Sequence, residues 1–116
     1  MNDATVARLI GGTTAASGAA LMAAPRTALR AMGAEAIDPA PLLYRVVGMF
    51  MAVSGGLLVD GATDTRALRW SLAQKTGAAL GVGLGVASGQ YRPRALAVAA
   101  FDAAGAVLLA RMLARR

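Results

Sequence analysis

Apolar positions fall into four long runs along the chain. The runs cover residues 5–24, 42–60, 70–90 and 94–114. A helix of about 20 apolar residues crosses the roughly 30 Å hydrocarbon core of a bilayer. The predicted fold class is therefore all-α, with residues 1–116 forming one domain, an integral membrane bundle of four transmembrane helices.

The link between the first and second runs, residues 25–41, is too short and too charged to cross a membrane. Arg26 and Arg30 lie four residues apart and therefore share one face of a helix. Leu29, on the same segment, is an apolar anchor. This pattern predicts a short interfacial helix between the first and second spans. An ordinary connecting loop fits the same residues.

Capping and helix-breaking residues mark the ends of the runs. Pro25 ends the first run, and Asp60-Gly61 closes the second. Asp64 is a suitable N-cap for the third helix, which therefore begins before its most apolar part. Pro93 stands at the favoured first position of the fourth helix.

Glycines at spacing four distinguish the third run. On a helix, this spacing places them on one face, where small residues let another backbone approach closely in a membrane. We therefore expect this face to be the packing spine of the bundle, and we expect small positions on the second and fourth runs to serve helix packing as well. Its partner is a helix of the same chain, a second copy or another protein. The residues concerned are Gly77, Gly81, Gly85, Gly89, Gly55 and Gly105.

The composition favours a membrane protein. Hydrophobic residues make up 57% of the chain, charged residues make up 16%, and the mean hydropathy is +0.56. Charged residues approach a quarter of a typical soluble domain. Because much of the apolar content is alanine, a soluble Ala-rich helical bundle is the alternative.

The residue types present exclude several kinds of site. The chain has no cysteine and no histidine, so disulfides, thiol chemistry, ordinary zinc sites and imidazole-bound haem are not expected. Aromatic residues are only 4% of the chain, too few for a base-stacking platform. The sequence shows no pairing of a nucleophile with a base. We predict no metal, no cofactor, no catalytic residue and no nucleic-acid partner.

The net charge of +6 comes from basic residues that cluster where apolar runs end. This distribution suits lipid head groups, and Tyr44, Trp70 and Tyr91 are placed like interface anchors. Counting basic residues on the two sides gives a small excess on the side of the termini. We therefore predict a multi-pass protein of the inner (plasma) membrane, in contact with lipids and with cytoplasmic termini.

Asp102 lies inside the fourth run, where a carboxylate is costly unless it is paired. Helical rise places it about 12 Å from the start of that run, and places Arg45 about 4–5 Å from the start of the second. A long arginine side chain can cover this difference, so the candidate site is an intramembrane Arg45–Asp102 ion pair. Such a pair is either a static element or a site for a substrate, ion or proton; otherwise Arg45 snorkels to the head groups.

Four short features follow one another along the chain: Ala24-Pro25-Arg26, Arg45-x-x-Gly48, Gly55-Gly56 and an acidic residue in a later span. Their order resembles the small, uncharacterised four-helix membrane proteins of bacteria that are distantly related to DoxX. The resemblance implies a four-helix bundle and no established reaction. Members of such families often have an Arg-Asp pair after the Arg-x-x-Gly motif, whereas this chain has Met49-Phe50, so a polar active site is not carried over.

Two functions fit these features. The first is a non-enzymatic accessory or structural subunit of a larger membrane complex, indicated by small size, many small residues and no catalytic constellation. Its partners would be other membrane subunits or further copies of the chain. The alternative is a small transporter, or a protein that binds a lipophile such as a lipid or quinone, using Arg45 and Asp102.

Overall fold

The computed structural model describes all residues from Met1 to Arg116 and contains helices without any strand, which confirms the all-α prediction. Four helices are long, and a short helix lies between the first two of them. The elements are α1 (Asp3–Ala23), α2 (Pro25–Ala31), α3 (Ala40–Asp60), α4 (Thr65–Ala87), a 3-10 turn η1 (Pro93–Ala95) and α5 (Leu96–Ala114).

Local signals set most of the helix ends. The side chain of Asn2 accepts a hydrogen bond from the Thr5 amide and caps α1. Asp64 caps α4 in the same way through the amide of Arg66, as its position predicts. Gly89 follows α4 with a φ of +77°, a conformation that favours glycine. Helix α2 lies within the link where a short interfacial helix was predicted.

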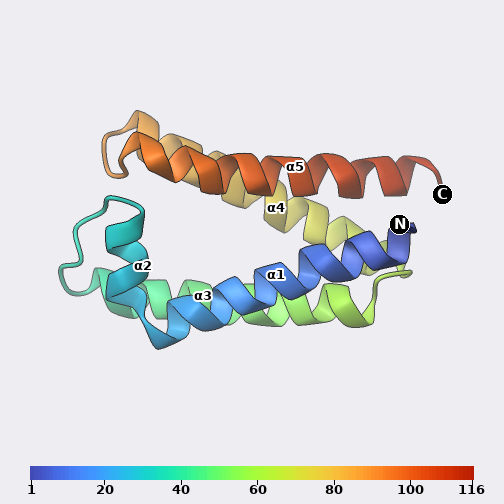
Figure 1. Cartoon of the computed structure of the whole chain (residues 1–116), viewed down its shortest axis with the longest axis horizontal. Helices are drawn as coiled ribbons and strands as arrows, with labels where there is room; N and C mark the ends of the chain where they lie inside the picture. Colours follow the sequence, from blue (N-terminus) through green and yellow to red (C-terminus); the bar gives the residue numbers. More distant parts are fainter.

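The long helices form two antiparallel pairs, α1 with α3 and α4 with α5 (Figure 1). Helices α1 and α3 approach so closely that their backbones are in contact. A Cβ added to Gly18 would overlap the carbonyl oxygen of Gly48, and one added to Gly55 would overlap the amide nitrogen of Ala15. Only glycine permits so close an approach, so small residues on both helices fix this pair.

The two pairs meet at the end of the molecule that carries both termini (Figure 1). A hydrophobic cluster joins all four long helices there. Close by, Arg115 pairs with Asp3 at 2.7 Å, and the Arg116 guanidinium donates to the carbonyl oxygen of Thr63. The cluster consists of Ala7, Ile10, Leu58, Ala62, Leu68, Leu109 and Met112.

Toward the opposite end the pairs diverge, and α2 lies between them (Figure 1). Polar contacts connect α2 to η1. The Arg94 guanidinium donates to the carbonyl oxygens of Arg30 and Ala31, and the amide of Arg92 donates to the carbonyl oxygen of Met32. The two helix pairs are therefore joined at both ends of the molecule and only loosely along the middle.

Two helices are long and apolar enough to cross a membrane, α3 and the segment Pro93–Ala114. Only 17% and 22% of their most apolar windows are buried inside the protein. The central helix of a soluble protein would be mostly buried, whereas these two helices leave most of their apolar residues exposed. Helices α1 and α4 are less apolar and do not meet the same criterion.

Of the partners left open for the glycine face of α4, a helix of the same chain is not found in the structure. Nothing in the chain lies within 4 Å of a Cβ added to Gly77, Gly81 or Gly89. A Cβ on Gly85 would meet the ring of Tyr91 rather than another helix. The face of α4 that packs on α5 is the other one, which carries Leu68, Ser71 and Lys75. The close glycine contacts belong instead to α1 and α3, and Gly55 is among them.

Substituting glycine on α1 tests this packing. Gly18→Ala should destabilise the fold by about 1–3 kcal/mol, because its Cβ overlaps the α3 backbone. Gly12→Ala, on the same helix with open space around it, should cause no loss. Thermal unfolding in mild detergent measures both. Equal stability of the two variants would contradict the close α1–α3 contact.

Candidate functional site

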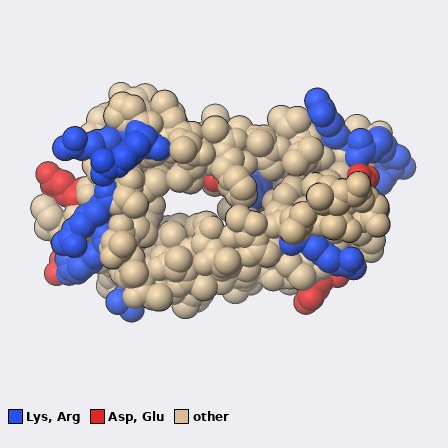
Figure 2. All heavy atoms as spheres, in the orientation of Figure 1, with Lys and Arg blue, Asp and Glu red and all other residues tan.

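A cavity of about 350 Å³ lies between the two helix pairs. All five helices and Arg94 contribute to its wall, which extends from the middle of the long helices to α2. Figure 2 shows the corresponding opening between the upper and lower helices. Most of the lining is apolar, and Leu21, Met32, Met51, Val82, Val98 and Phe101 are among the larger side chains.

A buried ion pair stands at the inner end of this cavity. The ammonium Nζ of Lys75 donates a hydrogen bond to Oδ1 of Asp102 over 2.8 Å. The two side chains are only 3% and 10% exposed. The same ammonium lies 5.2 Å from the centre of the Phe101 ring, within the range of a cation–π contact.

Helical position explains why these two groups meet. Lys75 is near the middle of the 23-residue α4, and Asp102 is in the first half of α5, which runs antiparallel to it. The alkyl chain of Lys75 passes over Gly105 at 3.5–3.7 Å from where a Cβ would be. A small residue at that position leaves room for the lysine stem.

Lys75 is the only lysine of the chain, and every other basic residue is arginine. All remaining charged residues lie in connections or within about two turns of a helix end, and Figure 2 shows the basic side chains gathered at both ends. Lys75 and Asp102 are therefore the only charged groups in the middle of the molecule. A compact ammonium suits a narrow space better than the broad fork of a guanidinium.

The candidate Arg45–Asp102 pair is not formed, because Asp102 is paired with Lys75. Arg45 is exposed and lines a different pocket, where α1 passes into α2. Its neighbour Tyr44, about 100° away around the helix, faces the central cavity, as does Met51 further along α3. The distances along the two helices allowed an Arg45–Asp102 pair. The rotation of α3 about its own axis instead places Arg45 in the pocket where α1 passes into α2.

The paired groups retain bonding capacity toward the cavity. The other carboxylate oxygen of Asp102, Oδ2, accepts no hydrogen bond within the chain, although every fully buried side-chain N or O atom has a partner. Oδ2 is therefore accessible. Lys75 uses one of its three N–H groups on Asp102. The site thus offers a charged acceptor and further donors beside apolar walls.

The predicted interface anchors lie toward the two ends. Tyr44 and Tyr91 are half-buried and line a pocket of about 670 Å³ beside α2. Trp70, in the second turn of α4, is 78% exposed.

Lys75 was not predicted as a site residue, because it follows Arg66 and Arg69 in an amphipathic stretch that is typical of a helix end at the membrane surface. Two sequence signals point to it. It is the sole lysine of the chain, and it lies ten residues, or about 15 Å, from the start of its helix at Thr65. A cation at that depth needs a carboxylate, and Asp102 is the one acidic residue at a comparable depth.

Comparison with known proteins adds no relative. Neither a family model, nor a curated protein, nor a solved structure matches the chain. The resemblance to DoxX-related proteins therefore stays a prediction, and function is inferred from the site itself.

A double-mutant cycle tests the ion pair. Asp102→Asn or Lys75→Met alone should cost about 3–5 kcal/mol, because each leaves a buried charge without its partner. The double variant should lose clearly less free energy of unfolding than the two single variants lose in sum. Unfolding in detergent gives the free energies.

The cycle of Arg45→Met with Asp102→Asn is the control. These two changes should be additive, since Arg45 does not touch Asp102. Additivity in the Lys75–Asp102 cycle would contradict the pairing.

Proposed function

We propose that the protein is an integral membrane protein whose four long helices cross the bilayer, and that its central cavity binds a small lipophilic molecule with a polar head group. The observation that carries this proposal is the Lys75–Asp102 pair, held at mid-length of the helices against a cavity of about 350 Å³. The proposal is one of binding, without a chemical step.

Helix length and charge placement support four crossings. Helices α1 and α3 have 21 residues each, α4 has 23, and η1 with α5 has 22. At 1.5 Å per residue these are about 31–35 Å long, which matches a hydrocarbon core of about 30 Å. Charged side chains gather at the two ends of the long axis (Figure 2). This arrangement would place the exposed apolar faces of α3 and α5 in lipid.

The cost of the ion pair supports a binding role. A charged residue at the bilayer centre costs roughly 2.5–3.5 kcal/mol on insertion scales, and such residues mark substrate and ion pathways in membrane proteins. A purely structural contact at this place could be apolar. The cavity volume falls in the range of about 300–1,000 Å³ that holds small ligands. The opening between the helix pairs (Figure 2) would give access to the cavity from the side of the bundle. In a membrane, that side faces the hydrocarbon in which lipophiles are dissolved.

Filling the cavity should remove the bound molecule. Ala78→Phe adds a ring to the cavity wall, whereas Ala73→Phe adds the same ring to the exposed face of α4. Both proteins are purified from their own membrane and extracted with organic solvent, and the extracts are compared by mass spectrometry. We expect a lipophile that co-purifies with wild type and Ala73→Phe and is lost from Ala78→Phe. Its equal retention by both variants would refute cavity binding.

A second candidate function is that of an accessory subunit in a larger membrane complex. The observation that favours it is the open face around Gly77 and Gly81 of α4, which no part of the chain covers. In a membrane, a face of small residues is a contact surface for a further helix.

The subunit hypothesis predicts a partner that is lost on Gly81→Leu. Native mass spectrometry of gently extracted protein should show a second protein at fixed ratio with wild type. Gly12→Leu, an equally open glycine on α1, should retain it. A monomer without partners in all three preparations would contradict this role.

A further inference from the structure

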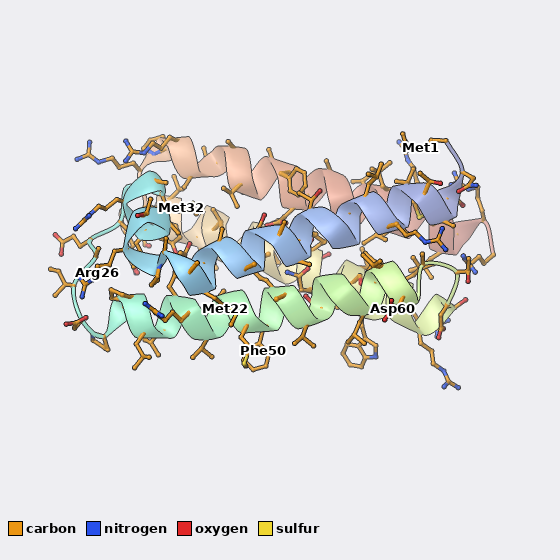
Figure 3. The ribbon with its side chains drawn as sticks, turned by 60° about the horizontal axis from the view of Figure 1, so that its bottom comes forward. Met1, Met22, Arg26, Met32, Phe50 and Asp60 are labelled. Atoms are coloured by element: carbon orange, nitrogen blue, oxygen red, sulfur yellow. The ribbon has the colours of Figure 1, made fainter.

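Arg45 lines a pocket of about 370 Å³ at the end of the molecule opposite the termini. The pocket lies where α1 passes into α2 and where α3 begins. Its polar lining consists of Arg26, Thr27, Asp38 and Arg45. Figure 3 shows Arg26 at this end, beside the loop that connects α2 and α3.

The charges of the pocket do not balance. The Arg26 guanidinium donates to Asp38 over 3.0 Å and to the carbonyl oxygen of Ala36, so these two charges neutralise each other. Arg45 takes part in none of the three ion pairs of the chain and donates no hydrogen bond within it. The pocket therefore retains one uncompensated guanidinium, which matches a single phosphate in charge and geometry.

An exposed apolar stripe on α3 begins beside this guanidinium. Leu42, Val46, Met49 and Val53 recur at helical spacing and are 42–63% exposed. Arg45 stands three residues after Leu42 and four before Met49, so it borders the stripe. Phe50, next to the stripe, points outward from α3 (Figure 3). A phosphate at Arg45 would have apolar surface directly below it for an acyl chain.

The depth of Arg45 suits a lipid head group. It is five residues after Ala40, about 7–8 Å along α3 from the helix start. If α3 crosses the bilayer, this position lies near the boundary between head groups and hydrocarbon, and the long side chain reaches outward to the phosphate level.

We propose that this pocket is a binding site for one anionic phospholipid, with the phosphate on Arg45 and an acyl chain along Leu42, Val46 and Met49. The site is separate from the central cavity and does not depend on what that cavity holds. It gives a role to an arginine that the ion pair at Asp102 leaves unused.

The test measures lipid binding by the full chain in mild detergent. Phosphatidylglycerol or phosphatidylcholine is titrated in, and native mass spectrometry counts the bound lipids. Wild type should hold one phosphatidylglycerol in preference to phosphatidylcholine. Arg45→Gln should bind it about tenfold more weakly, the scale of one charge-assisted contact, while Arg45→Lys should retain part of the affinity.

Arg8→Gln is the matched control, because Arg8 is an exposed arginine without an ion pair at the opposite end of the molecule. It should leave binding unchanged. Equal loss from Arg8→Gln and Arg45→Gln, or equal binding of both lipids, would overturn the proposal. Displacement of the lipid by millimolar inorganic phosphate would show a free-anion site and would also overturn it.

Discussion

The ion pair between Lys75 and Asp102 is the interaction around which the centre of this protein is built. It joins α4 to α5 at mid-length, and it is the only place where charge occurs far from a helix end. Breaking such a pair is far more costly than forming it is favourable, because the remaining charge stays buried. The pair therefore constrains the register of α4 against α5, and it also leaves a carboxylate oxygen accessible beside the cavity.

Two kinds of contact position this pair. The glycine contacts between α1 and α3 hold these two helices together as one half of the molecule, and the hydrophobic cluster near the termini attaches the other half to it. Toward α2 the halves separate, and Arg94 connects η1 to α2 across the gap. Because the halves are in close contact near the termini and are separated by α2 at the opposite end, a cavity remains between them. The binding proposal rests on this cavity together with the Lys75–Asp102 pair at its inner end.

Periodicity and capping signals are local, and they predicted the helices well. The four apolar runs, the break at Pro25 and the cap at Asp64 correspond to helices and helix ends in the structure. Rotation of a helix about its axis is set by tertiary packing, and it could not be read from depth alone. Asp102 was correctly singled out as needing a partner, but Arg45 proved to lie on another face of α3. The glycines of α4 face outward for the same reason, while those of α1 and α3 make the backbone contact.

The most direct test of this account uses the single lysine of the chain. Protein labelled with ¹⁵N-lysine and ¹³C-aspartate is reconstituted in bilayers, and solid-state NMR measures the dipolar coupling from Nζ to the aspartate carboxyl carbons. We predict one ammonium signal, slow to exchange with water, with a coupling to one carboxyl carbon, as expected when Nζ lies 2.8 Å from Oδ1 of Asp102, and this coupling disappears in Asp102→Asn. A rapidly exchanging lysine without any carboxyl coupling would contradict the buried pair, and with it the binding site built on it.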